Sequence, residues 1–361
     1  MDQFPQLHIN QSAIIHNLKQ IKKRVGSDVK VMGVVKANAY GLGALPIADL
    51  LTKNEINYLA VARRCEADEL KTLNLPVPIL IFEPLIDCSD LDPAFSYTIS
   101  DIDILKQLVK VGSEIQIQLK VNTGMNRIGM SVNDLISALD LIGKNPNLLL
   151  NGIYTHLASS DDLENPHCLA QLEVFKQLYK ELKPRYPDCL FHAANSAAIF
   201  NYQESHFDMV RSGIALYGTY PNLNLTIDWE IKPVVELKTR VVQVKPIEAG
   251  DTVGYSAAYR SKKESRIATI QIGYADGYKR ILSNSAQVLI NGALYPLVGN
   301  VSMDLVTVDI GSAKIRLGDE VILIESGRNS TVALEKIAEK SATIPYEIIS
   351  SFSRRVQRIY R

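Results

Sequence analysis

Eight short apolar runs, separated by stretches of helical periodicity, occupy the first two thirds of this 361-residue chain and constrain its fold most. The apolar runs are 29–35, 58–61, 77–82, 97–99, 115–121, 148–154, 190–193 and 209–210. The helical stretches between them are 13–24, 44–53, 65–73, 104–111, 132–142, 168–182 and 194–202. This alternation predicts an α/β fold with an N-terminal (β/α)8 barrel of the TIM type. An open, doubly wound sheet is the alternative.

The pattern changes near Lys232-Pro233, after which runs rich in Val, Ile and Thr follow one another. These runs are 234–246, 266–272, 287–290, 305–310 and 320–324. Asn291-Gly292 between two of them indicates a hairpin. We expect a C-terminal mainly-β domain, interrupted by a single helix at 332–340. The run 6–9 reads as a further strand, followed by Asn10 as a helix cap. The predicted domains are a barrel over 10–230 and a β-domain formed by 1–9 and 231–361.

Charge and cysteine usage narrow the range of partners. The 39 Lys and Arg residues balance 39 Asp and Glu residues, which argues against a nucleic-acid surface. No apolar run is long enough to span a bilayer, and the first residues lack the pattern of a signal peptide. The four cysteines show no zinc or disulfide spacing. We therefore expect a cytoplasmic protein without nucleic-acid or membrane partners.

Barrel enzymes build their sites from residues at the carboxyl ends of the strands. The polar residues at these positions here are Lys36, Lys120, Arg127, His156, His192, Asn195, Ser196, Arg211 and Ser212. The set is cationic and contains no pair of carboxylates, which disfavours hard-metal and glycosidase sites. No metal is expected.

Two features of this rim have two readings each. Lys36 is either a surface lysine or a nucleophilic Schiff-base lysine, with Ala37, Ala39 and Gly41 leaving room for a planar cofactor. The loops at Asn195-Ser196 and Ser212-Gly213 each precede a predicted helix, so they either cap it or bind a phosphate. The two loops together, beside a strand-end lysine, favour the phosphate.

A series of short motifs covers nearly the whole chain. They are VKANAYG at 35–41, KVNTGM at 120–125 with Arg127, GIYTH at 152–156, HAANS at 192–196, GIALYG at 213–218, GYS at 254–256, IGYADG at 272–277 and VSMD at 301–304. In this order they resemble the alanine racemases, which are isomerases that use pyridoxal 5'-phosphate (PLP) and combine a barrel with a β-domain. The resemblance implies interconversion of L- and D-alanine, with D-alanine supplied for peptidoglycan.

The resemblance also implies two catalytic bases on opposite faces of the cofactor. Lys36 matches the Schiff-base lysine and one base, and Tyr255 matches the other. A tyrosine has an ordinary pKa of about 10, so its pKa must be lowered to work near neutrality. We expect His156 and Arg211, as nearby cations, to lower it.

Further roles follow from the same resemblance. Arg211 matches the residue that donates to the pyridine nitrogen, Arg127 the one near the phenolic oxygen and the substrate carboxylate, and Met303 a carboxylate contact through its backbone. Lys120 matches a lysine that is carbamylated in family members, and a carbamate turns its repulsion from Arg127 into attraction. The residues that match the phosphate-binding set are Tyr40, Ser196, Gly213, Ile214 and Tyr346.

Four positions depart from the family pattern, and none is a proposed base. Leu42 replaces a common His, Asn122 an Asp, Ser212 a Pro and Pro345 an Asn. The family forms head-to-tail homodimers with shared sites, and the same is expected here because Tyr255 and Lys36 fall in different predicted domains.

Other functions remain open at this stage. A related PLP-barrel decarboxylase or D-threonine aldolase is a second enzymatic reading, although a decarboxylase of this kind is expected to place an acid where Arg211 stands. A PLP carrier is a third reading, but single-domain carriers lack the predicted β-domain. Alanine is the default substrate, and serine or a longer amino acid stays open.

Overall fold

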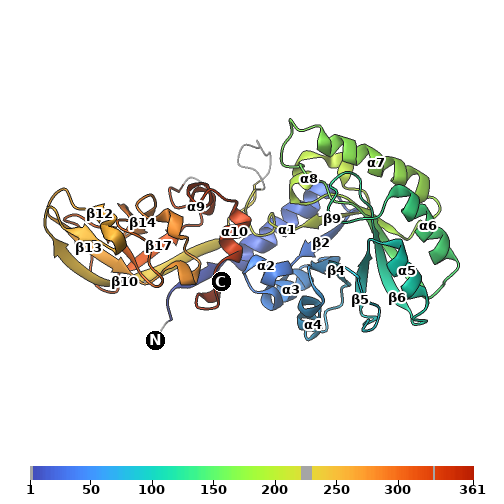
Figure 1. Ribbon diagram of the computed structural model, residues 1–361, viewed down its shortest axis with the longest axis horizontal. Coiled ribbons are helices and arrows are strands. Elements are labelled where there is room, and N and C mark those ends of the chain that lie inside the picture. The colour runs from blue at the N-terminus through green and yellow to red at the C-terminus, as the bar shows by residue number, and fades with distance from the viewer. Residues whose placement is uncertain (1–2, 221–229, 328–329) are drawn as a thin grey trace.

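The computed structural model describes residues 3–220, 230–327 and 330–361. Two domains lie end to end along the long axis of the molecule (Figure 1). The first contains an eight-stranded parallel sheet with the order β8-β7-β6-β5-β4-β3-β2-β9. Its strands are β2 (Lys30–Val34), β3 (Tyr58–Val61), β4 (Ile79–Pro84), β5 (Phe95–Ile99), β6 (Ile115–Lys120), β7 (Leu148–Tyr154), β8 (Leu190–His192) and β9 (Met209–Ser212).

Backbone hydrogen bonds close this sheet between the segments of β8 and β9. The amide of Asp208 donates to the carbonyl of Phe191 at 3.0 Å, and the amide of Arg211 donates to the carbonyl of Ala194 at 2.9 Å. The predicted TIM-type barrel is confirmed, and the open sheet is excluded.

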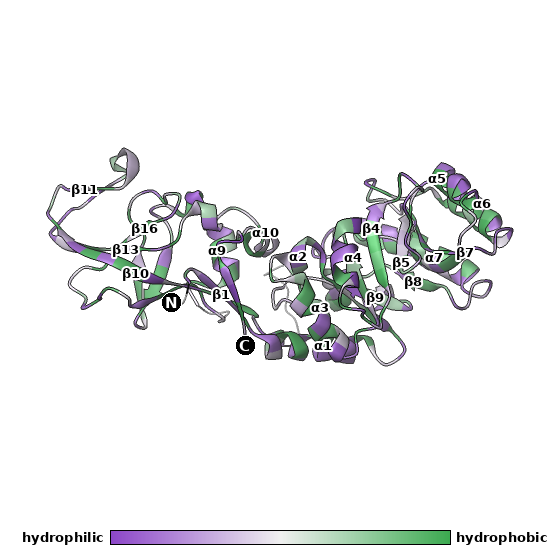
Figure 2. Ribbon diagram, turned by 90° about the horizontal axis from the view of Figure 1, so that it is seen from below, coloured by the Kyte–Doolittle hydropathy of each residue, from purple (hydrophilic) through white to green (hydrophobic). Residues whose placement is uncertain are grey.

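Helices cover the outside of the barrel. They are α1 (Gln11–Val25), α3 (Ala44–Lys53), α4 (Arg64–Lys71), α5 (Ile102–Val109), α6 (Val132–Gly143), α7 (His167–Leu182) and α8 (Ser196–Asn201). Helix α1 buries Ile14, Leu18 and Ile21, spaced by three or four residues as one helix face requires. Figure 2 accordingly shows both hydrophobic and hydrophilic residues along α1. Asn10 caps this helix as predicted, because its side chain accepts from the amide of Ala13 at 2.9 Å.

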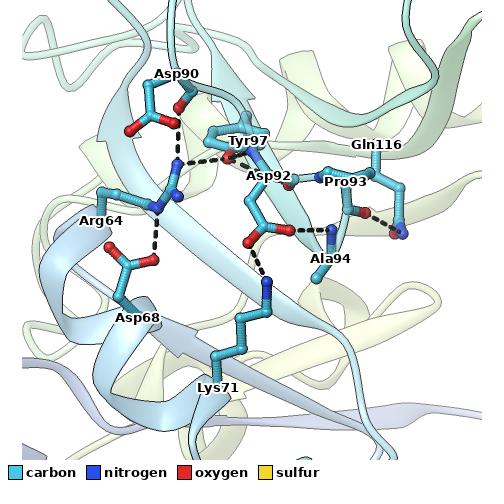
Figure 3. Close-up of polar contacts among 9 residues, drawn as sticks. All are labelled: Arg64, Asp68, Lys71, Asp90, Asp92, Pro93, Ala94, Tyr97 and Gln116. Carbon is cyan, nitrogen blue, oxygen red and sulfur yellow. Dashed lines mark hydrogen bonds and ion pairs between the residues drawn. The ribbon is translucent and has the colours of Figure 1, made fainter.

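The connection from β4 to β5 contains no helix, and polar contacts to α4 hold it instead (Figure 3). Arg64 donates to the carbonyl of Asp90 at 2.8 Å and to the hydroxyl of Tyr97 at 3.1 Å. Lys71 pairs with Asp92, whose amide donates to the Tyr97 hydroxyl at 2.8 Å. These contacts fix the segment on the barrel wall without a helix to pack there.

The second domain is mainly β. Strand β1 (Gln6–Ile9) pairs antiparallel with β10 (Val235–Ile247) and parallel with β18 (Gln357–Tyr360). The other strands are β11 (Thr252–Val253), β12 (Tyr259–Arg260), β13 (Ser265–Ile270), β14 (Gln287–Ile290), β15 (Ala293–Pro296), β16 (Val306–Asp309) and β17 (Glu320–Ile324). The predicted hairpin joins β14 to β15, with positive φ at Asn291 (50°) and Gly292 (79°). The exact domain boundaries stay predictions.

The prediction of a single helix in this domain is wrong. Helix α9 (Leu334–Lys340) is followed by α10 (Pro345–Ser350). Pro345 stands in the first turn of α10, where its missing N–H needs no partner, and Ile348 and Ile349 are buried. Helix α10 lies at the junction of the domains, next to the short segment α2 (Lys36–Tyr40) (Figure 1).

Four single 3-10 turns complete the described elements. They are η1 (Gln203–Ser205), η2 (Tyr255–Ala257), η3 (Tyr274–Asp276) and η4 (Arg280–Leu282). None of the helices in the described ranges has both the length and the apolarity to cross a bilayer.

Candidate active site

A cavity of about 380 Å³ opens at the carboxyl ends of the barrel strands. The barrel residues to which the sequence assigns a role line it, whereas His192 and Ser212 of the predicted rim do not, and α10 of the β-domain adds Tyr346. The predicted residues in its wall are Lys36, Tyr40, Lys120, Arg127, His156, Ser196, Arg211, Gly213, Ile214 and Tyr346. Their placement in one cavity agrees with the sequence analysis, while the role assigned to each stays a prediction.

Two predicted residues do not line the cavity of their own chain. Tyr255, in η2, is 72% exposed, and Met303 is 52% exposed. Both belong to the β-domain. One chain therefore assembles the proposed cofactor site and leaves the second proposed base on the protein surface.

Lys36 follows the end of β2, where the chain leaves the barrel sheet. It is half-buried, and burial together with Arg127 lowers the pKa of its amine, while Glu66 opposes that shift. A lowered pKa increases the fraction of neutral amine near neutrality, which is the form that acts as nucleophile or base.

The residues after Lys36 form a left-handed turn. Ala37, Asn38, Ala39 and Tyr40 have φ values of 52°, 55°, 50° and 56°. Each non-glycine residue in this conformation costs about 1–2 kcal/mol. Small residues were expected beside Lys36, but their left-handed backbone conformation was not predicted.

Arg211 is a buried cation held by four neighbours. It donates to Nδ1 of His192 at 2.8 Å, and to the carbonyls of Thr155 at 2.8 Å and Ala193 at 2.9 Å. The nitrogen that donates to Nδ1 of His192, Nη1, also donates to the carbonyl of His192 at 3.0 Å. Because a guanidinium only donates, Nδ1 of His192 is an acceptor, so Nε2 carries the proton toward Gln118 Oε1 at 2.8 Å. Burial lowers the pKa of Arg211 to about 10, which leaves it charged at neutral pH.

The expectation that His156 is a cation is wrong. Its Nδ1 lies 3.3 Å from Nη2 of Arg211, and burial and then Arg211 hold the pKa of the imidazole well below its usual range. His156 is therefore neutral, with its proton on Nε2. Of the two residues, only Arg211 is a cation in this cavity.

Lys120 is a buried amine among cations. It is 7% exposed, and burial, Arg211, Arg127 and Lys36 lower its pKa to about 8. Its Nζ lies 5.5 Å from the centre of the Tyr154 ring. A large part of this amine is neutral near pH 8, in contrast to an exposed lysine.

A group of neutral donors forms another part of the cavity wall. Ser196 Oγ accepts from the amides of Gly213 at 3.0 Å and Ala215 at 3.3 Å, which joins the two predicted loops. Burial raises the pKa of the Tyr40 and Tyr346 phenols, which keeps them protonated. A Cβ on Gly213 would clash with the Tyr40 hydroxyl, so a larger residue would force Tyr40 to shift.

The helix predicted after the Ser212-Gly213 loop is absent. Helix α8 begins at Ser196 as expected, but the segment after β9 forms successive turns. The amide of Leu216 donates to the carbonyl of Gly213 at 2.9 Å, and that of Tyr217 to Ile214 at 3.0 Å. This spacing of three residues is that of turns and not of an α-helix.

Other residues of the wall, above all Tyr154, were not predicted from the sequence. Its ring stacks on His192 at 4.8 Å, and its hydroxyl bonds Thr98 at 2.8 Å. Tyr154 ends β7 and lies two residues before His156. Because side chains alternate along a strand, residues two apart face the same side, and this spacing could have indicated Tyr154. Phe82 and Asp161 also line the cavity, and no motif pointed to them.

The family models for the N-terminal and C-terminal domains of alanine racemase match residues 9–221 and 234–360. The chain belongs to the alanine racemase family. Alanine racemase 2 of Caldanaerobacter subterraneus subsp. tengcongensis is 37% identical, over 98% of this chain and 94% of that protein. The alanine racemase of Halothermothrix orenii is 36% identical, over 98% and 96%.

Solved structures of alanine racemases share the fold over the full chain. That from Clostridium difficile 630 has a TM-score of 0.91 at 32% identity, covering 100% of this chain and 96% of that one. That from D-cycloserine producing Streptomyces lavendulae has a TM-score of 0.93 at 28% identity, covering 100% and 98%. The barrel and the β-domain are thus the two parts of the alanine racemase fold.

Proposed function

We propose that this protein is a PLP-dependent alanine racemase that interconverts L- and D-alanine. The observation that carries the proposal is the content of one cavity: the Lys36 amine with a lowered pKa, the buried Arg211 cation, and a group of neutral donors suited to a phosphate. The names of the relatives support alanine as the substrate.

The residues present fit PLP. The hydroxyls of Tyr40, Ser196 and Tyr346, with the close approach at Gly213, would hold its phosphate, and Lys36 would hold its aldehyde carbon. When bound, its ring withdraws electrons from the Cα of the substrate and makes the Cα proton more acidic.

Arg211 sets the strength of that effect. Its guanidinium would donate a hydrogen bond to the ring nitrogen and could not accept one from it, so the nitrogen would stay unprotonated. Electron withdrawal by such a ring would be weaker, which would favour return of the Cα proton over the breaking of other bonds. An arginine at this position favours a racemase over a related decarboxylase, in which an acid is expected there.

Racemisation requires bases on both faces of the substrate. Lys36 removes or returns the proton on one face, and Tyr255 of the partner subunit serves the other. Tyr255 has the exposure that such a contribution requires, and Met303 is exposed in the same domain. The proposed assembly is a homodimer with shared active sites.

Arg127 and the backbone of Met303 of the partner subunit are proposed to bind the substrate carboxylate. Lys120 is proposed to carry a carbamate, formed when its neutral amine attacks CO₂ and releases a proton. The lowered pKa of Lys120 supports this reaction, and a negative carbamate relieves the repulsion from Arg127 and Arg211.

We further propose that the enzyme works in the cytoplasm and supplies D-alanine for peptidoglycan. The four cysteines, Cys65, Cys88, Cys168 and Cys189, are unpaired in the structure, as a reducing compartment favours.

Incubation of L-alanine with the purified protein and PLP, followed by chiral chromatography, tests the activity. We expect the enantiomers to approach equal amounts, and the K36A variant to stay at background. A panel of L- and D-amino acids that includes serine establishes the substrate range. Retention of pure L-alanine by a folded, PLP-loaded protein would refute the proposal.

A further inference from the structure

The left-handed turn at 37–40 is held by residues that do not line the cavity. On its barrel side, Glu66 Oε1 accepts from the amide of Ala37 at 2.6 Å. The second oxygen, Oε2, accepts from the amides of Ala62 at 2.8 Å and Arg63 at 3.0 Å. Glu66 thus joins the first residue after Lys36 to the end of β3.

The bond to Ala37 goes beyond what helix α4 requires. Glu66 stands in the first turn of α4, and its Oε2 contacts are those of a capping residue. Its Oε1 contact reaches outside α4 to another segment of the chain. Capping alone therefore does not account for the full set of bonds.

The β-domain holds the other end of the turn. Arg358 donates from Nε to the carbonyl of Gly41 at 3.0 Å, and the hydroxyl of Tyr360 donates to the carbonyl of Leu42 at 2.7 Å. The remaining donors of Arg358 bind carbonyls of its own segment, at Phe352, Ser353 and Val356. The guanidinium is thus a rigid link between the C-terminal segment and the turn.

We propose that Glu66 and Arg358 are positioning residues that together hold the strained turn, and with it the backbone of Lys36, between the barrel and the β-domain. Strained backbone persists only where its surroundings fix it from several sides. Neither residue is in the wall of the cavity, so both hold the Lys36 backbone through the turn, and Glu66 also acts on the Lys36 amine through its charge. The inference rests on the proposed function only in the role given to Lys36.

The variants E66Q and R358K test the proposal in the full-length protein. E66Q keeps the shape of the side chain but replaces one of its two acceptor oxygens with an NH2 group, which cannot accept a hydrogen bond from a backbone N–H. R358K keeps the charge but loses the planar fork. The matched controls are E69Q, an exposed position on α4, and R354K, an exposed position on the C-terminal segment.

Hydrogen exchange of peptides that cover 36–43 is the first readout, because it needs no activity. We expect exchange there to be about tenfold faster in both variants, with the rest of the barrel unchanged and both controls like the wild type. In the PLP-loaded enzyme, kcat falls by about the same factor, whereas KM changes by less than about twofold, since neither residue touches the substrate.

Exchange at 36–43 that stays within about twofold of the wild type in both variants overturns the proposal. Faster exchange throughout the barrel also overturns it, because that result indicates general destabilisation. A change in only one variant removes the other residue from the proposal. If E66Q does not fold, R358K decides the result. If the wild type fails to racemise alanine while exchange responds as expected, the proposed function fails and the positioning role stands.

Discussion

Replacement of Lys120 by methionine is expected to stabilise the protein when CO₂ is absent. The folded state lowers the pKa of this amine from 10.5 to about 8, so the unfolded chain binds more protons between these values. The stability of the wild type therefore rises as pH increases from about 8 to 10.5. Below pH 8 the full free-energy cost of burying the charged amine is present. A difference of about 2.5 pKa units corresponds to about 3 kcal/mol.

Urea unfolding in CO₂-free buffer measures this penalty. At pH 7 we expect the free energy of unfolding of K120M to exceed that of the wild type by about 3 kcal/mol. At pH 9.5 we expect a difference of about 1.4 kcal/mol, since this pH is within about one unit of the pKa of the amine in the unfolded chain. The control K144M, at an exposed position, changes stability by less than about 0.5 kcal/mol.

Bicarbonate separates the free amine from the carbamate. Added bicarbonate stabilises the wild type, adds the mass of one CO₂ to the intact protein, and removes the advantage of K120M. If K120M is less stable than the wild type at pH 7 without CO₂, the reasoning about the cationic cluster is refuted.

Three other changes probe the cavity. R211K is expected to lower the free energy of unfolding by about 2–5 kcal/mol, because one ammonium cannot reach all the buried acceptors; urea curves that overlap with the wild type contradict this. G213A is expected to weaken PLP binding at least about tenfold in equilibrium dialysis, since its Cβ meets the Tyr40 hydroxyl; unchanged affinity contradicts this reasoning. T98V leaves the buried Tyr154 hydroxyl unpaired and is expected to cost about 1–3 kcal/mol in thermal or urea unfolding, whereas neutral behaviour would indicate a replacement partner.

The barrel was predictable because strands buried on both faces form short apolar runs that stand out between amphipathic helices. Periodicity of this kind is a local property, so β3 and β14 match their predicted ranges. Helix α10 was missed because six residues give too little periodicity, and because Pro345 was treated as a departure from a motif and not as a helix start.

The site was predictable where a residue lies at or just after the end of a strand: Arg211 lies near the end of β9, and Lys36 and His156 come shortly after β2 and β7. The left-handed turn after Lys36 was not, because Ala and Tyr do not favour that backbone and distant residues such as Glu66 hold it in place. The charge of His156 was mispredicted for a similar reason. Its protonation depends on burial beside Arg211, which only the folded structure reveals.

Mixing of two inactive variants tests the shared, two-base site most directly. In a dimer of one K36A subunit and one Y255F subunit, shared sites place both lesions in one site and leave the other intact. Free subunit exchange makes about half of the dimers mixed, so we expect about a quarter of the wild-type activity to return. Activity that stays at background, with mixed dimers confirmed by native mass spectrometry, would contradict the proposed site.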